Sequence, residues 1–111
     1  MKKLLTLSAL AALFATAGAV GHAASAKENW DNLCAKCHAE DGSGSTKIGK
    51  KLKVKDYTDA KAQALFTDEQ AIKITSEGAT RDGKDLMKGF KDELKPDEVK
   101  ALVEYIRTLK K

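Results

Sequence analysis

The sequence predicts an all-α domain in which three to four helices are joined by long loops. Thr67 and Gln70 have the spacing of a capping box, which marks the start of a helix. Pro96 stands where a first helical position is expected. An apolar stripe at helical spacing follows it, made of Val99, Leu102, Val103, Ile106 and Leu109. No segment shows the regular alternation of apolar and polar residues that is typical of a half-buried strand.

The elements before Thr67 follow from local patterns. A short helix is expected over Lys27–His38, because Trp30, Leu33 and Cys34 recur at helical spacing. A loop rich in glycine and serine, a basic stretch and a further short helix are then expected at residues 41–46, 47–55 and 59–66.

The elements after Thr67 follow from helix-end signals. The helix that begins there is expected to end near Gly78, since glycine is favoured just beyond a helix. Gly83 and Gly89 indicate a loop over residues 81–91. The last helix has acidic residues in its first turn and lysines in its last turn, the signs that the helix dipole favours.

Residues 1–26 have the layout of a secretory signal peptide. A basic start precedes an uncharged run rich in leucine and alanine, and Ala24-Ser25-Ala26 provides an A-x-A cleavage pattern. Cleavage after Ala26 leaves one domain, residues 27–111, and cleavage after Ala24 is a close second. The alternative is a retained membrane anchor, although the run is short and weakly apolar for a span.

The composition limits the function. Removal of Lys2 and Lys3 with the leader lowers the formal net charge from +4 to +2, so charge gives little reason to expect a nucleic-acid partner. A domain of this length excludes large enzyme folds and buries a modest core. Only 5% of the residues are aromatic, so a bound cofactor is expected to fill part of the interior.

The residues with the clearest chemistry are Cys34-Ala-Lys-Cys37-His38, a C-x-x-C-H sequence that is typical of c-type haem attachment. Two thiols three residues apart can add to the two vinyl groups of one haem. The adjacent His38 can then supply an imidazole nitrogen to the iron. A disulfide, a thioredoxin-like redox pair and a zinc site are the alternatives. Each fits less well, because the ring would be very small, no βαβ pattern is present, and no other Cys or His remains after cleavage.

Met87 is expected to be the second axial ligand. Electron-transfer haems use His/His or His/Met ligation, and after removal of the leader no second histidine remains. Met87 lies 49 residues after His38, far enough along the chain to reach the opposite face of a haem. The alternatives are a methionine that fills the core and an open iron that suits gas binding or peroxide chemistry.

Together these residues resemble the small class I monohaem c-type cytochromes of the bacterial periplasm, over essentially all of residues 27–111. Trp30 and Tyr105 stand where such cytochromes place aromatic partners on the first and last helices. The loops also match, at residues 37–44, 87–90 and 94–98. The resemblance implies the class I cytochrome c fold, in which the helices and loops wrap around one covalently attached haem c and its iron, with the first and last helices crossing.

The sequence departs from this family pattern at three places. Lys88 follows Met87 where proline is common, and Lys95 stands where a Ser or Thr usually caps the last helix. Pro96 is the only proline, so the family's proline after the haem motif is missing. The hydrogen bond from the second nitrogen of His38 is therefore expected to go to the backbone of residues 48–52 or to another acceptor.

The expected function is that of a periplasmic one-electron carrier and not of an enzyme. We expect a monomer that meets an upstream donor and a terminal oxidase or reductase transiently, and that reaches a membrane only through these partners unless the leader is retained. Lysines cluster in the segments expected around the haem and would suit an acidic docking patch. The alternatives are an open-iron peroxidase or gas sensor and a haem subunit of a membrane oxidoreductase.

Overall fold

The computed structural model describes residues 25–111. The predicted signal peptide up to Ala24 lies outside these residues, so its removal stays a prediction. Among residues 25–111, no helix is long and apolar enough to cross a membrane.

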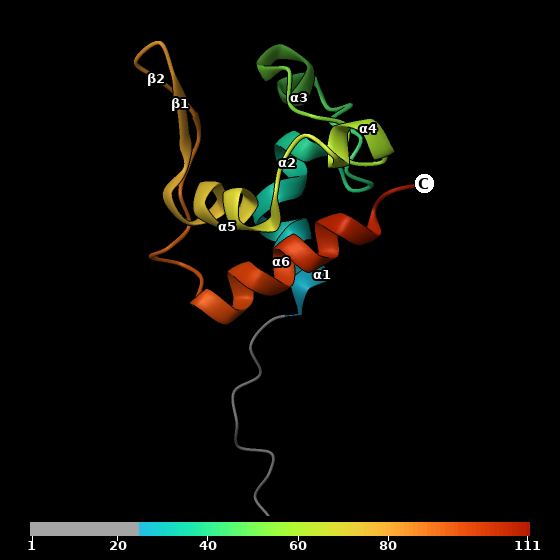
Figure 1. Cartoon of the computed structure of the whole chain (residues 1–111). Coiled ribbons are helices and arrows are strands. Elements are labelled where there is room, and N and C mark those ends of the chain that lie inside the picture. The colour runs from blue at the N-terminus through green and yellow to red at the C-terminus, as the bar shows by residue number, and fades with distance from the viewer. Residues whose placement is uncertain (1–24) are drawn as a thin grey trace, which may run out of the picture.

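The described chain is mostly helical, as predicted, and a single β-hairpin stands at one end (Figure 1). A helical segment at the N-terminal side leads to His38, and a long last helix crosses beneath it. The elements are α1 (Ala26–Asn29), the π-helical turn η2 (Trp30–Cys34), α2 (Ala35–His38), α3 (Lys47–Leu52), α4 (Ala60–Gln63), α5 (Asp68–Glu77), β1 (Ala79–Arg81), β2 (Lys84–Met87) and α6 (Pro96–Thr108).

The predicted first helix is present and contains a π turn that the sequence analysis did not predict. Ser25 caps α1 by accepting a hydrogen bond from the Glu28 amide, and the Glu28 side chain accepts one from the Ser25 amide in return. In η2 the amide of Ala35 donates to the carbonyl of Trp30, five residues earlier. Helix α2 then ends at His38.

The signals that predicted α5 and α6 act as expected. The Thr67 hydroxyl accepts from the Gln70 amide at 3.0 Å, and α5 ends at Gly78, which has a φ of 86°. Helix α6 begins at Pro96. The Lys95 side chain makes no capping bond, but the carboxylate of Glu98 accepts from the Lys95 amide at 3.0 Å and so satisfies one free donor of the helix start.

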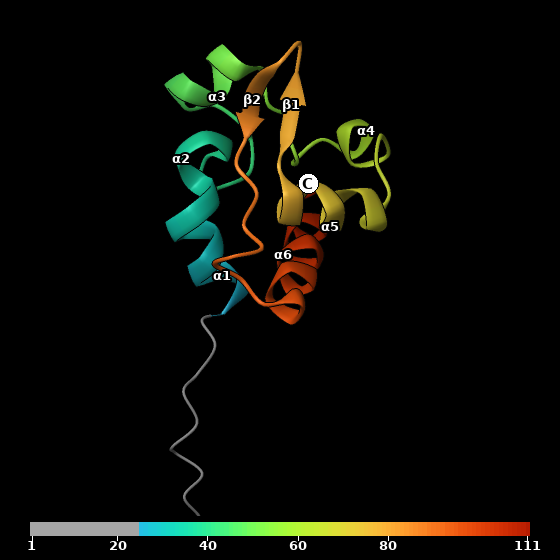
Figure 2. The same ribbon diagram turned by 90° about the vertical axis from the view of Figure 1, so that its left-hand side faces the viewer.

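The core lies where α6 packs against both α1 and α5 (Figure 2). Four residues of the predicted apolar stripe are buried, and Leu109 is half-buried. Trp30 is 1% exposed and packs against Tyr105 of α6 with ring centroids 5.8 Å apart, so the two aromatic residues meet at the helix crossing as the resemblance implied. Beside them, Asn29 donates a hydrogen bond to Glu98 at 3.3 Å.

The prediction of a plain loop at residues 81–91 was wrong for its first half. Arg81 and Lys84 are paired in an antiparallel hairpin formed by β1 and β2. Asp82 and Gly83 form its tip, both with positive φ, at 51° and 78°. Asp-Gly is the favoured pair for a tight two-residue hairpin turn. The strands are too short to show a clear period, so the turn was the one usable signal.

Arg107 of α6 fastens the long segment between α3 and α5. Its guanidinium donates to the carbonyl of Gln63 at 2.6 Å and to that of Phe66 at 2.9 Å. Gln63 is buried and links the same segment to α6 a second time. Its side-chain amide donates to the carbonyls of Tyr57 and Ile106 at 2.7 and 2.8 Å. This segment therefore lies on α6 although it contains only one short helix.

Replacing Arg107 with methionine keeps the aliphatic length of the side chain and removes these donors. We expect the free energy of unfolding of the protein to fall by about 2 kcal/mol, because partly buried carbonyls lose a charged partner. Urea titration measures this loss. Lys100→Met, at an exposed position of the same helix, is the control and should change stability by less than about 0.5 kcal/mol. Equal losses in the two variants would show that Arg107 does not fasten the segment.

Candidate functional site

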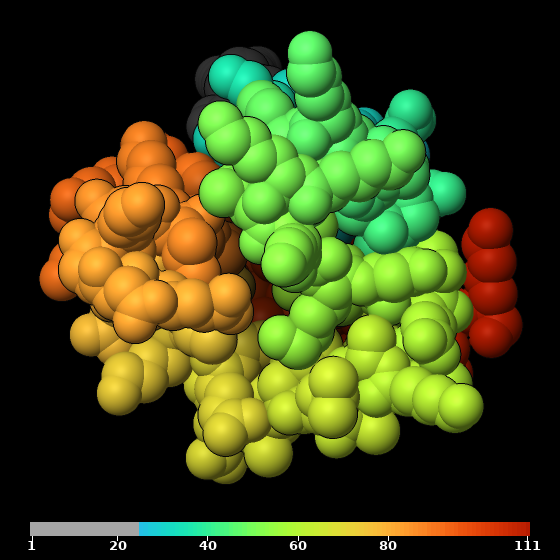
Figure 3. Space-filling view, turned by 90° about the horizontal axis from the view of Figure 1, so that it is seen from above, coloured from blue at the N-terminus to red at the C-terminus, as the bar shows by residue number. Residues whose placement is uncertain are grey.

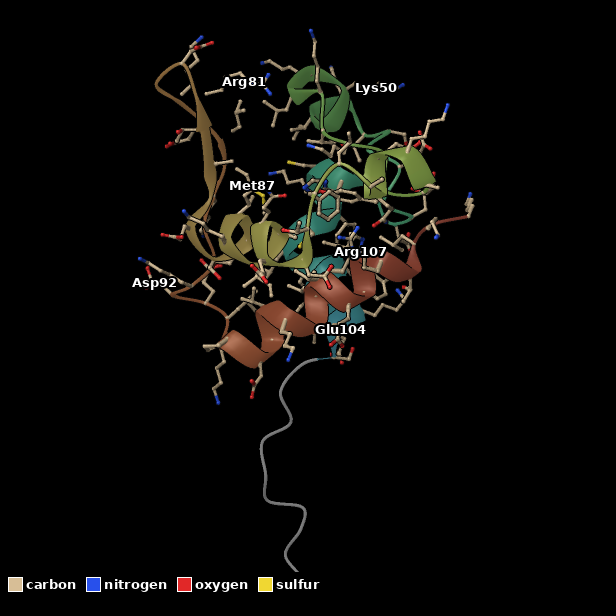
Figure 4. All side chains as sticks on the ribbon, in the orientation of Figure 1. Lys50, Arg81, Met87, Asp92, Glu104 and Arg107 are labelled. Carbon is tan, nitrogen blue, oxygen red and sulfur yellow. The ribbon has the colours of Figure 1, made fainter. Side chains whose placement is uncertain are left out.

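The four residues predicted as the haem site line one cavity of about 530 Å³. Cys34, Cys37 and His38 come from η2 and α2, and Met87 comes from the end of β2. Figure 4 shows Met87 between the foot of the hairpin and the α2 segment. The fold thus brings Met87 to the same cavity as His38 despite their separation in the sequence.

The cavity opens at one end of the molecule and is largely apolar inside. Figure 3 shows the surface hollowed between the α3 side, the hairpin and the segment leading into α5, with atoms of α6 visible in the depth of the hollow. The apolar lining residues are Leu33, Leu52, Val54, Ile74, Leu86 and Phe90. A smaller space of about 70 Å³ shares Cys34, His38 and Met87 and reaches Leu102 and Ile106 of α6. A cavity of this size and lining is typical of cofactor sites.

A larger depression of about 770 Å³ lies elsewhere, between Tyr105, Leu109 and the loop at Glu40 and Asp41. It is open, and no Cys, His or Met is among its lining residues. The chemistry of the chain is therefore concentrated in the cavity at Cys34, even though the depression is larger.

Both cysteines are free thiols. Burial raises the pKa of the Cys34 thiol to about 11, and the neighbouring Cys37 adds to the rise. Cys34 is therefore protonated near neutral pH, whereas a thiol–disulfide oxidoreductase needs a thiolate with a depressed pKa. The buried Cys34 is therefore unlike the reactive thiol of a thioredoxin-type redox pair.

His38 is held as a neutral imidazole. Burial lowers its pKa, and the positive charge of Lys55 lowers it further. A neutral ring is the form that binds a metal. Its Nδ1 atom is buried and has no hydrogen-bond partner, so the acceptor expected in the backbone of residues 48–52 is absent from this structure.

Aromatic rings surround His38. The ring of Tyr57 stacks on the imidazole at 5.3 Å with an interplanar angle of 23°, and the ring of Trp30 lies at 5.7 Å. Burial raises the pKa of Tyr57, so its phenol is neutral. Two free thiols, a neutral imidazole, a thioether and apolar walls fit a covalently attached haem. Among residues 25–111, no three side chains of Cys, His, Asp or Glu are grouped so that they could hold a metal ion directly.

Backbone contacts with the end of α5 hold the Met87 segment in place. Phe90 and Lys91 donate from their amides to the carbonyls of Thr75 and Ser76, at 2.9 and 3.1 Å. Gly78 lies so close that an added Cβ would stand 2.6 Å from the carbonyl oxygen of Met87. These contacts were not predicted. The only signals for them in the sequence were the glycines that flank the segment, Gly78 and Gly89.

The family is settled by comparison with known proteins. The model of the Cytochrome c family matches residues 23–110. The chain belongs to the cytochrome c family. Its fold is that of the family, its cofactor is a covalently bound haem c with iron, and it is an electron-carrier haem protein, as the resemblance implied.

Solved structures agree with this assignment. The KustC0563 c-type cytochrome is 35% identical, with a TM-score of 0.70, and the match covers 79% of this chain and all of the other. A mutant of the same cytochrome, in which a tyrosine is replaced by phenylalanine, is 34% identical with a TM-score of 0.68, over 78% of this chain and all of that one. No curated protein sequence matches the chain. This cytochrome is therefore similar to small monohaem c-type cytochromes over its whole described domain.

The close approach at Gly78 leads to a test of how the Met87 segment is held. Gly78→Ala should destabilise the haem-loaded cytochrome by several kcal/mol, because both the positive φ and the contact with the Met87 carbonyl oppose a side chain. Gly83→Ala is a matched control, since Gly83 also has a positive φ but has nothing within 4 Å of the added carbon. It should lose only about 1 kcal/mol in urea unfolding. A loss no greater at Gly78 than at Gly83 would contradict the packing at Met87.

Proposed function

We propose that this cytochrome is an exported one-electron carrier whose haem is attached through Cys34 and Cys37 and whose iron is ligated by His38 and Met87. The observation that carries the proposal is that these four side chains line the same apolar cavity. The bound haem supplies an iron that changes between the ferric and ferrous states and so carries one electron. All other properties of the carrier come from the residues around it.

The two cysteines act as the tether. The thiols of Cys34 and Cys37 would each add across one vinyl group of the haem, with hydrogen and sulfur joining the double bond, so that no leaving group would be formed. Cys34 is buried and Cys37 is half-buried, and both line the cavity. Covalent attachment keeps the cofactor in a small domain whose own core is modest.

His38 and Met87 set the redox behaviour. The neutral imidazole of His38 offers one donor, and the soft thioether of Met87 favours the ferrous iron and so raises the reduction potential. The apolar walls exclude water and penalise the additional positive charge of the ferric form, which raises the potential further. With both axial positions filled by the chain, no substrate can bind at the iron, and we therefore propose a carrier and not an enzyme.

The distribution of charge supports docking to an acidic partner. Basic residues line the mouth of the cavity, namely Lys36, Lys53, Lys55, Arg81 and Lys88. Figure 4 shows Lys50 and Arg81 at this end of the molecule, whereas Asp92 and Glu104 lie toward the other. This group of positive charges around the cavity favours an approach to negative charge before contact. We propose a monomer that forms brief complexes with redox proteins, in the periplasm after removal of the N-terminal leader.

Met87 tests the ligation directly. In Met87→Ala, the weak red sulfur-to-iron absorption band of the ferric protein should disappear, the reduced protein should bind carbon monoxide, and the potential should fall, since the soft ligand is gone. Leu86→Ala, at a neighbouring position that also lines the cavity, should keep the band. An unchanged spectrum in Met87→Ala would refute the proposed ligand. Binding of carbon monoxide by the unmodified protein would favour the open-iron reading.

Docking is tested with an electrode coated with a carboxylate-terminated monolayer as the acidic surface. Reversing two charges at the mouth, Lys53→Glu with Arg81→Glu, should slow electron transfer about tenfold at low ionic strength. Reversing Lys61 and Lys100 changes the net charge equally, but neither residue lines the cavity, so this pair should have little effect. Equal slowing in both pairs, or a rate that is independent of salt, would contradict a specific docking face.

A further inference from the structure

We propose that Trp30 is a positioning residue for His38, acting through a strained peptide at Ala39. This inference rests on the proposed function, because it concerns the orientation of an axial ligand. It starts from a backbone outlier. Ala39, the residue directly after His38, has a φ of 72° and a ψ of 156°, a conformation that is essentially reserved for glycine.

Ala39 has little freedom to leave this conformation. It is 7% exposed, and its amide donates to the carbonyl of Ala35 at 2.8 Å, which completes the turn of helix that ends at His38. A non-glycine residue in this region costs about 1 to 3 kcal/mol and persists only where the surroundings hold it. The contacts around Ala39 must therefore offset this strain.

The indole of Trp30 stabilises the conformation of Ala39 through hydrogen bonds. Its Nε1 donates to the carbonyls of both Ala39 and Glu40, each at 3.1 Å. Trp30 is 1% exposed; its bond to Ala39 is buried, and its bond to Glu40 is partly buried. Glu40 is exposed, and the indole thus ties a buried and an exposed peptide to the core at the point where the chain leaves the haem motif.

The neighbouring carbonyls are held in the same way, from other directions. The Cys37 carbonyl accepts from the Thr46 hydroxyl at 2.9 Å, and the His38 carbonyl accepts from the Gly44 amide at 2.8 Å. The imidazole itself has no such anchor, because Nδ1 has no partner. Its orientation therefore depends on the backbone on either side of it and on the adjacent rings of Trp30 and Tyr57.

Trp30 is placed for this task by the π turn. The turn begins at Trp30, whose carbonyl accepts the amide of Ala35, and it ends at Cys34. π turns within helices are frequent at functional sites. Here the turn joins the residue that holds Ala39 to the first thiol of the haem motif. Trp30 also packs on Tyr105 of α6. Trp30 therefore links α6 to the peptide of Ala39, which directly follows His38.

The test removes only the indole N–H. Trp30 is the single tryptophan of the chain, so growth of a tryptophan auxotroph on benzothienylalanine replaces that one side chain by an isostere with sulfur in place of the N–H. In the ferric haem-loaded protein, we expect the paramagnetically shifted NMR signals of the haem methyls and of the His38 ring to move. The unfolding equilibrium constant should rise about tenfold, since two carbonyls lose the indole donor and only that of Ala39 keeps a second one, the amide of Gly42 at 3.1 Å.

A second variant separates positioning from simple packing. Ala39→Gly accepts the same backbone conformation without strain. Alone, it should leave the NMR shifts in place. Combined with the isostere, it should restore most of the shift pattern, because a glycine keeps the turn without the indole bond. Trp30→Phe with Ala39→Gly provides the same comparison in a genetically encoded form.

The outcomes are distinct. Shifts that do not move in the isostere protein, or that move and are not restored by Ala39→Gly, would overturn the positioning role and leave Trp30 as a core residue. Absence of an axial histidine signature in the unmodified protein would instead overturn the proposed function, and this inference with it. Movement with restoration supports the proposal.

Discussion

Both walls of the haem cavity are held by α6. On one side, η2 and α2 are fixed through Trp30, which packs on Tyr105 at the helix crossing. On the other, the segment after Met87 is bonded by its backbone to the end of α5, and α5 packs on α6. Burial of one face of α6 therefore sets the position of His38 relative to Met87. A domain with few aromatic residues can keep two ligands apart in this way while leaving room for a cofactor between them.

Neutral and charged groups occupy different parts of the site. The groups that face the interior are neutral: a thiol with a raised pKa, an imidazole with a lowered pKa and a phenol with a raised pKa, each shifted chiefly by burial. The charged groups stand at the mouth, and they are mostly basic. A low-polarity interior suits a site whose net charge changes by one unit, and a charged mouth suits brief contact with a partner.

The sequence allowed much of the fold to be predicted, because the decisive signals were local. Thr67 with Gln70, Gly78 and Pro96 mark helix ends that depend on a few neighbouring atoms. The hairpin was missed although Asp82-Gly83 is a strong turn signal, since its strands are too short to show a period. The network of Arg107 could not be predicted, because it joins residues distant in the sequence. The π turn and the conformation of Ala39 depend on nearer contacts, but no residue pattern marks them. The four candidate haem residues were named from spacing and elimination, and the structure adds that they line one cavity. The expected acceptor for His38 was not found in residues 48–52, which form part of helix α3; there the carbonyls of Gly49 and Lys50 accept from the Lys53 amide instead.

The measurement that tests the central claim most directly is near-infrared magnetic circular dichroism of the ferric, haem-loaded protein, recorded with its visible spectrum before and after reduction. The charge-transfer band in this region depends on the pair of axial ligands. We predict a low-spin iron with the band of histidine and methionine ligation, and a reduced protein that does not react with carbon monoxide. A high-spin iron, or a low-spin iron without the methionine band, would contradict the account of a carrier closed by His38 and Met87.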